Sequence, residues 1–331
     1  MTPDILSLKD FFNDAARKKR APLVRKFITR IYEARADLRN VPVFVPVAGN
    51  SAVTVIIGDE VFKTPLATKK SAATFDRELA IMKVLTDNKT PFIPALTYIS
   101  GDETFFAMQK TKGVTLNSIK GQMKDEDYAR FAADFGRARA KIDLSLQQTH
   151  LPLWSKFNPA SKHEDIINLM GKWDKPYVQD VLAQIPQDLR AMLDEYKTIA
   201  TQGRNLFRHI DLHDGNIMMD PDTKRLSGFI DMSNAVQSPF PEKEFCNLFY
   251  IFNSDGRGHA LVDATYKAYS ETTATLGVRP FDCFAHDFIG TMAFWMGNND
   301  TKAPELVKRS VNNCVEAVDR ALRLFPCYKK P

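Results

Sequence analysis

The sequence predicts an α+β protein in which a small antiparallel β lobe carrying one helix is joined to a larger, mainly helical lobe. Three observations lead to this prediction: β-prone runs broken by tight turns between residues 43 and 110, a helical spacing inside that region, and helical texture from residue 125 onward. The chain has 331 residues, enough for two unequal lobes. We therefore expect an N-terminal helical arm over residues 1–40, a small lobe over 41–108 and a large lobe over 109–331.

Residues 1–40 are predicted to form a basic helical arm. They hold ten Lys or Arg and five Asp or Glu, which accounts for the net charge of +5. Apolar residues recur every three or four positions over 22–38, as in an amphipathic helix: Leu23, Phe27, Ile31, Ala34 and Leu38. Docking on a neighbouring lobe is favoured over a membrane surface, because most surface helices carry such a stripe.

Residues 43–109 predict a five-stranded antiparallel unit interrupted by one helix after its third strand. Two strands, 53–57 and 61–63, flank Gly58-Asp59, a hairpin signal. Helical spacing follows over residues 70–86. Two more strands, about 95–100 and 103–109, are joined by Gly101-Asp102.

The large lobe contains one expected exception to its helical texture. Ile217–Met219 and Leu226–Ile230 are apolar runs separated by Asp-Pro-Asp at 220–222, which predicts a β-hairpin within a helical domain.

Composition argues against several functional classes. The basic residues of the arm are too local for a nucleic-acid surface, so we expect no nucleic-acid partner. No apolar run is long enough to cross a bilayer, and the first ten residues lack the pattern of a secretory signal, so the expected location is cytoplasmic. The four cysteines are far apart and predict buried free thiols: Cys246, Cys283, Cys314 and Cys327. The oligomeric state stays open.

The stretch that carries most chemistry is residues 208–217, Arg-His-Ile-Asp-Leu-His-Asp-Gly-Asn-Ile. It contains His-x-Asp-x-x-x-x-Asn directly before a predicted strand, and Asp231 follows twenty residues after Asp211. Phosphoryl transfer needs one carboxylate to accept a hydroxyl proton and separate oxygen ligands for Mg²⁺. Each residue alone also fits a turn or strand cap, but the ordered set indicates a kinase.

Here the chain resembles the aminoglycoside phosphotransferase family and its choline-kinase relatives, whose signature runs close to H-G-D-L-H-x-G-N and then I-D-W. The resemblance implies the bilobal protein-kinase-like fold. It also implies that Asp211 is the catalytic base and that Asn216 and Asp231 bind Mg²⁺. His209 and His213 match the two histidines of the signature and are assigned with the catalytic group, although a buried supporting role suits His209 better.

The small lobe supplies the expected nucleotide site. Lys63 on a strand and Glu78 in the next helix are the expected ion pair that reaches the ATP phosphates, although an ordinary exposed pair is the alternative. By resemblance, residues 47–53 form the loop over the nucleotide. Its expected nucleotide-binding members are Gly49, Asn50 and Ser51. The hinge between the lobes is expected at Met108 and Lys110, although the apolar residues there also suit a core.

Three positions depart from the family pattern: Ile210 replaces a small Gly, Met232 replaces Trp, and Asn247 replaces a structural Asp. These departures weaken any transfer of substrate from the family. Candidates for the acceptor site on the helical lobe are acids, an amide and an aromatic that also suit an ordinary helix face: Asp255, Asp282, Asp287, Trp295, Asn299 and Asp300.

The predicted function is ATP-dependent phosphorylation of a hydroxyl on a small molecule, such as an aminoglycoside, a choline-like amino alcohol or a sugar. A protein kinase is disfavoured because Met-Ser, not Phe-Gly, follows Asp231. A pseudokinase scaffold and an adaptor using the basic arm are the remaining alternatives.

Overall fold

The computed structural model describes residues 5–13, 20–46, 52–146, 206–209, 211–238 and 258–273, with isolated positions 149, 176, 179, 180, 183, 187, 190, 191 and 248. The chain forms two compact units. Unit 1 comprises residues 1–127, 148–152 and 209–235, and unit 2 comprises 128–147, 153–208 and 236–331. The lobe boundary expected after residue 108 stays a proposal.

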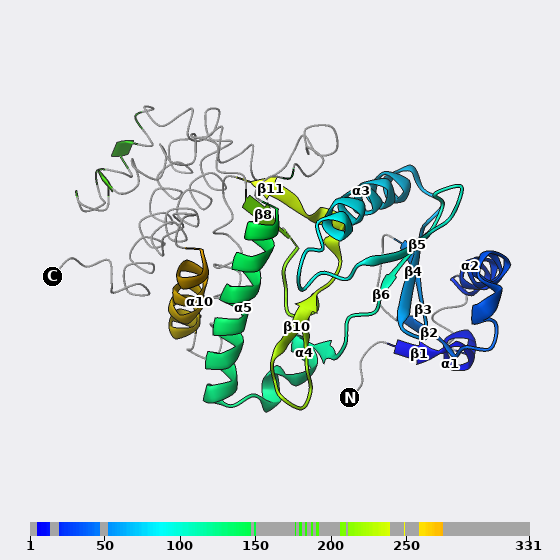
Figure 1. Cartoon of the computed structure of the whole chain (residues 1–331), viewed down its shortest axis with the longest axis horizontal. Helices are drawn as coiled ribbons and strands as arrows, with labels where there is room; N and C mark the ends of the chain where they lie inside the picture. The colour runs from blue at the N-terminus through cyan, green and yellow to red at the C-terminus, as the bar shows by residue number, and fades with distance from the viewer. Residues whose placement is uncertain are drawn as a thin grey trace. The chain divides into compact units, whose positions relative to one another are not determined.

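Unit 1 is built on a six-stranded antiparallel sheet with the order β1-β2-β3-β4-β6-β5 (Figure 1). The strands are β1 (Ile5–Ser7), β2 (Val43–Pro46), β3 (Ala52–Ile57), β4 (Glu60–Pro65), β5 (Leu96–Ile99) and β6 (Phe106–Gln109). The five antiparallel strands predicted for residues 43–109 are present, with the helix after the third, and a sixth strand extends the sheet. The sixth strand comes from the arm, where Ile5 pairs with Pro46 at the edge of β2.

Helices α2 (Ala21–Ala34) and α3 (Lys69–Asp87) lie on opposite sides of this sheet (Figure 1). Side chains along β6 point alternately to the two faces of the sheet, so this one strand contributes to the packing of both helices. Phe105, just before β6, and Ala107 join the α2 core, whereas the Phe106 ring stacks at 5.1 Å on Phe75 of α3. The same alternation places Phe62 in the α2 core and its neighbour Lys63 on the α3 side.

Helix α2 of the arm packs on the six-stranded sheet, as expected for docking within the protein, but the predicted stripe was partly wrong. The helix ends at Ala34 and is followed by a 3₁₀ turn at Ala36–Leu38. Its buried residues are Val24, Phe27, Ile28 and Ile31. Phe27 and Ile31 are buried as predicted, whereas Leu23 is 40% exposed because Val24 takes the inward position. A short helix α1 (Leu8–Asn13) precedes it.

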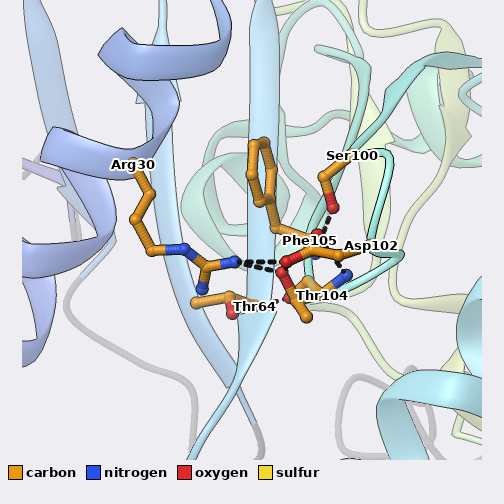
Figure 2. Close-up of polar contacts among 6 residues, drawn as sticks. All are labelled: Arg30, Thr64, Ser100, Asp102, Thr104 and Phe105. Carbon is orange, nitrogen blue, oxygen red and sulfur yellow. Dashed lines mark hydrogen bonds and ion pairs between the residues drawn. The ribbon is translucent and has the colours of Figure 1, made fainter.

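A polar anchor joins α2 to the turn between β5 and β6 (Figure 2). The Arg30 guanidinium donates to Thr104 Oγ1 and lies 3.4 Å from Asp102 Oδ2. The Thr104 side chain and backbone N–H donate to Asp102 Oδ1 at 2.7 and 3.2 Å. Hydrogen bonds from Ser100 and Thr104 lower the pKa of Asp102 to about 2. Because these side chains organise the turn, the strands stop at Ile99 and restart at Phe106.

Helix α3 begins at a regular cap. Thr68 has extended backbone, and its hydroxyl accepts the N–H of Ser71 at 3.1 Å. The predicted helical face is buried: Phe75, Leu79, Met82 and Leu85. Glu78 lies on the same face, so its carboxylate enters the interior beside β4.

The predicted hairpin is present and belongs to a three-stranded sheet with the order β10-β9-β7. The strands are β7 (Val114–Thr115), β9 (Ile217–Met219) and β10 (Leu226–Phe229). Helix α4 (Leu116–Ile119) and two 3₁₀ turns, η3 (Lys120–Gln122) and η5 (Met232–Asn234), complete the part of unit 1 that is described. Gly113 allows the close approach of β7, because a Cβ there would lie 2.0 Å from the Met219 carbonyl oxygen.

Unit 2 contains α5 (Asp125–Ser145), whose first residues belong to unit 1, together with α10 (Gly258–Thr272) and the strand pair β8 (Leu206–Arg208) and β11 (Val236–Ser238). Buried Asp143 ties these elements together. It accepts the Phe207 N–H at 2.9 Å and the Tyr269 hydroxyl at 2.8 Å. In the part of the chain that is described, no helix has the length and apolar character needed to cross a membrane.

Candidate active site

Lys63 and Glu78 form the predicted ion pair, with 2.6 Å between Nζ and Oε1. The two side chains are only 13% and 5% exposed. Burial on its own would lower the pKa of Lys63, but the negative charges of Glu78 and Asp231 outweigh it and raise the pKa overall. Lys63 is therefore a cation whose position is fixed by strand β4, on which it lies, and by Glu78 of helix α3.

Asp231 lies on the other side of this cation. Its Oδ1 is 3.6 Å from Lys63 Nζ, and its side chain is 39% exposed. Partial burial would raise the pKa of Asp231, but the Lys63 charge and hydrogen bonds from Ser233 lower it overall. Asp231 is thus an ionised carboxylate that lies beside Lys63 and remains partly exposed to solvent.

The backbone at Asp231 is left-handed, with φ 64° and ψ 67°. This conformation costs a non-glycine residue roughly 1–3 kcal/mol and persists only where the surroundings impose it. Three backbone contacts fix the residues just before it. Phe229 N–H donates to the Phe92 carbonyl at 2.8 Å, Ile230 N–H donates to the Asn216 carbonyl at 3.0 Å, and His209 Nε2 lies 2.7 Å from the Ile230 carbonyl.

His209 is 1% exposed, so the structure gives it a supporting contact on the segment before Asp231. This geometry agrees with the supporting role and not with contact to substrate. His213 is exposed, and its Nδ1 accepts the Gly215 N–H at 3.0 Å. Asp214, the residue after His213, is ion-paired with Lys120. This pair anchors the loop on η3.

Asp211 and Asn216 lie in the same loop and are oriented differently. The Asp211 side chain is exposed, whereas Asn216 is 7% exposed. The Asn216 amide nitrogen donates to the Asp211 carbonyl at 2.9 Å. This bond identifies Oδ1 as the Asn216 side-chain atom available to a cation. The two residues are therefore held together through one backbone–side-chain bond.

The donors fit Mg²⁺ with nucleotide phosphates. Mg²⁺ takes oxygen ligands and generally one or two carboxylates from the protein, leaving other positions to phosphates and water. Asp231 supplies an ionised carboxylate, Asn216 an amide oxygen, and Lys63 a cation for phosphate. Within the described ranges, no three His, Cys, Asp or Glu side chains gather as a metal site of their own.

Of the expected hinge residues, Met108 is buried on β6 and Lys110 is exposed. The N–H groups of Gln109 and Lys110 donate to the carbonyls of Ala95 and Asp59, at 2.8 and 2.7 Å. Those two donors are therefore already used within the sheet. Contact of Met108 and Lys110 with a nucleotide stays a proposal.

Several predicted residues lie outside the described part of the chain. These are the loop residues Gly49, Asn50 and Ser51, the departures Ile210 and Asn247, the four cysteines, and all six candidates for the acceptor site. Met232, the remaining departure, is 1% exposed and begins η5.

Arg77 was missed by sequence reasoning. Its guanidinium donates from Nε to the Ser233 carbonyl at 2.6 Å and from Nη2 to Asn234 Oδ1 at 2.8 Å. Its position next to Glu78 was the available signal. The partners are 156 and 157 residues away, so the sequence could not reveal what Arg77 contacts.

Comparisons with known proteins identify the family and the fold. The sequence model of the phosphotransferase enzyme family matches residues 43–277. No curated protein matches the sequence. The GDP complex of aminoglycoside 2'-phosphotransferase-IIIa is similar in structure, with 16% identity, 89% of this chain and 98% of that chain covered, and a TM-score of 0.50.

Two further structures are similar at comparable levels. The GDP and kanamycin complex of APH(2'')-IIIa has 17% identity, 89% and 99% coverage and a TM-score of 0.50. Choline kinase LicA from Streptococcus pneumoniae has 13% identity, 89% and 99% coverage and a TM-score of 0.47. The two structures with a TM-score of 0.50 confirm the predicted kinase-like fold.

Proposed function

The chain belongs to the phosphotransferase enzyme family, and from this premise we propose that it is a kinase that transfers the γ-phosphate of ATP to a hydroxyl of a small molecule. The observation that carries the proposal is the arrangement around Lys63. An ionised lysine is held 2.6 Å from Glu78 and 3.6 Å from Asp231, in the same unit as the loop that bears Asp211 and Asn216.

We assign the roles as follows. Lys63 neutralises charge on the nucleotide phosphates and is aimed by Glu78. Asn216 and Asp231 would hold Mg²⁺, which when bound supplies charge neutralisation at the phosphates. The nucleotide loop with Gly49, Asn50 and Ser51, and the hinge with Met108 and Lys110, stay assigned to the nucleotide. His213 stays a proposed member of the site.

Asp211 is the proposed proton acceptor. The acceptor oxygen forms a bond to the γ-phosphorus while the bond from that phosphorus to the bridging oxygen breaks, and ADP leaves with the bond electrons. The hydroxyl proton passes to the Asp211 carboxylate. Because that carboxylate is exposed while the loop behind it is fixed by Asn216, a substrate hydroxyl can approach it from solvent.

The acceptor is proposed only as a class. One similar structure is a complex with the aminoglycoside kanamycin and another is a choline kinase, and both compounds are hydroxyl-bearing cations. Aminoglycosides, amino alcohols and sugars are therefore the first compounds to test. GDP in two of the similar structures makes GTP a necessary second donor in the same test. A cytoplasmic location also stays a prediction.

The test is acceptor-stimulated ADP release with Mg-ATP, followed by three variants. Asp211→Ala is expected to bind Mg-ATP normally and to lose about 10²–10⁴-fold in transfer rate, the usual scale for a positioned acid–base group. Asp231→Ala is expected to weaken Mg-nucleotide binding itself. Asp222→Ala, an exposed acid in the turn of the same hairpin, is the matched control and should behave as wild type.

Nucleotide binding without turnover on any acceptor would favour a scaffold over an enzyme. Turnover that is unaffected by Asp211→Ala would remove Asp211 as the proton acceptor.

A further inference from the structure

Helix α3 carries two charged residues in succession that reach different parts of the candidate site. Glu78 holds Lys63, as described. Arg77, the residue before it, is half-buried and makes two hydrogen bonds to η5, the turn that directly follows Asp231. Both bonds are charge-assisted and come from one planar guanidinium, so they fix the orientation of the turn as well as its distance.

The position of η5 matters because Asp231 is the residue at which the chain leaves β10. The residues before Asp231 are already fixed by Phe92, Asn216 and His209. The left-handed conformation at Asp231 also needs a restraint on the residues that follow it. A strained residue relaxes when the chain on either side of it is free to move. The turn supplies part of that restraint itself, through the Ala235 N–H to Met232 carbonyl bond of 2.9 Å and the hydrogen bonds from Ser233 to the Asp231 carboxylate. The two Arg77 bonds add a restraint from outside the turn.

We propose that Arg77 is a positioning residue for the Mg²⁺ ligand Asp231, and that α3 thereby sets the phosphate lysine and the metal ligand together, through Glu78 and Arg77. The inference rests on the proposed function, since it assumes that Asp231 binds the metal of a nucleotide complex. Arg77 itself contacts neither group. It acts by holding the backbone from which the carboxylate projects, as residues behind metal ligands commonly do.

If Arg77 only stabilised the fold, its substitution would have a different measurable effect. In that case its removal would lower the melting temperature and leave the affinity of the folded protein for Mg²⁺ unchanged. A positioning role instead changes the Mg²⁺ dependence of nucleotide binding in protein that is fully folded. ATP is the probe, and its binding is measured by calorimetry over a range of Mg²⁺ concentrations, with the melting temperature recorded without ligand.

Four variants of the full chain separate these roles. Arg77→Met keeps the aliphatic stem and removes both donors, and Arg77→Lys keeps the charge but cannot make the paired bonds. Asn234→Ala removes one acceptor and leaves the bond to the Ser233 carbonyl. Lys83→Met is the matched control, because it removes an exposed cation from the same helix, 2.7 Å from Glu103.

The Mg²⁺ concentration for half-maximal ATP binding should rise about tenfold or more in Arg77→Met, the usual scale for residues behind a metal ligand. Smaller rises are expected in Arg77→Lys and Asn234→Ala, and none in Lys83→Met. ATP binding without Mg²⁺ should change less than twofold in every variant. Amide hydrogen exchange in residues 232–235 of the ligand-free protein should be faster in Arg77→Met than in Lys83→Met.

An unchanged Mg²⁺ dependence in folded Arg77→Met would overturn the inference and leave the proposed function standing. Wild-type behaviour of Arg77→Lys beside a defective Arg77→Met would assign the effect to charge, which also contradicts a positioning role. If the wild type bound ATP without any Mg²⁺ dependence, the proposed function would fail, and the inference with it.

Discussion

At the scale of single residues, the site depends on one buried cation shared by two carboxylates. Lys63 is closest to Glu78, which is more deeply buried, while Asp231 keeps part of its surface in solvent. Burial raises the pKa of Glu78, the Lys63 charge opposes that rise, and the Asp231 charge adds to it. The Lys63 charge therefore favours the ionised form of Glu78, and Glu78 in turn holds Lys63.

Lys63→Met should make the stability of the protein fall as pH rises above the unfolded pKa of Glu78. Without Lys63, the folded-state pKa of Glu78 lies still further above its unfolded value of about 4.3. Its contribution to stability is then complete below that unfolded value and is lost as pH rises through the folded pKa. We expect urea unfolding to give a lower free energy at pH 8 than at pH 5, with a total loss of up to about 3–5 kcal/mol.

The double variant Lys63→Met/Glu78→Gln is the control for this prediction, because Gln carries no proton equilibrium. Its unfolding free energy should fall less between pH 5 and 8 than that of the single variant, because only Asp231 then responds to the loss of Lys63. A single variant whose stability falls no more than that of the double variant would show that Glu78 is not confined in a buried position.

The sequence could predict the residues of this group but not their mutual constraints. The 15-residue spacing from a strand lysine to a helix glutamate identified the pair, and the signature identified Asp231. Neither pattern carries information on the left-handed backbone at Asp231, on the Arg77 bonds to η5, or on the use of the Lys110 N–H by Asp59. These depend on contacts between residues far apart in the chain.

At the scale of elements, local periodicity was reliable where the element was long. Helix α3 and the hairpin strands lie close to their predicted positions, because each carries a complete apolar pattern. The predicted stripe of α2 was right at Phe27 and Ile31 but wrong at its start, where Val24 is buried in place of Leu23. Both residues are apolar, so periodicity alone does not choose between them. Strand β1 has three residues, too few to show any period, and it is defined only by its pairing with β2.

Gly228 on β10 gives an element-scale prediction. A Cβ at this position would lie 2.8 Å from the Phe92 carbonyl oxygen, which accepts the Phe229 N–H that fixes the strand before Asp231. Gly228→Ala should therefore push β10 away, with a destabilisation of about 1–3 kcal/mol as in other overpacked sites. It should also weaken Mg-ATP binding. Urea unfolding and calorimetry measure the two effects.

Gly101→Ala is the matched control, because a Cβ there meets nothing within 4 Å. It should leave both stability and Mg-ATP binding near the wild-type values. Gly228→Ala with wild-type stability would mean that β10 has room to move, and it would contradict the tight seating of the strand against Phe92.

At the scale of the whole molecule, the candidate site is assembled from distant parts of one chain. Unit 1 combines residues 1–127 with 209–235, so Lys63, Glu78, Asn216 and Asp231 share a unit although more than 130 residues separate Glu78 from Asn216. The ordered motifs allowed the sequence to predict this assembly through a family resemblance. Physical periodicity alone indicated only a β-rich part followed by a helical part.

This assembly predicts where Mg-ATP slows local hydrogen exchange. Mg-ATP at 100 times its dissociation constant stabilises the folded protein by about 2.7 kcal/mol. Local openings that disrupt the site become less favourable by that amount, so the amides they expose exchange more slowly. We therefore expect slower exchange in peptides from residues 52–65, 69–87 and 211–235 of unit 1, and little change in α10 of unit 2.

Asp231→Asn is the control, because Asn tolerates a left-handed backbone while lacking the charge, so the variant should fold and show weaker protection. Protection centred on α10 with none in residues 211–235 would place nucleotide binding outside the candidate site.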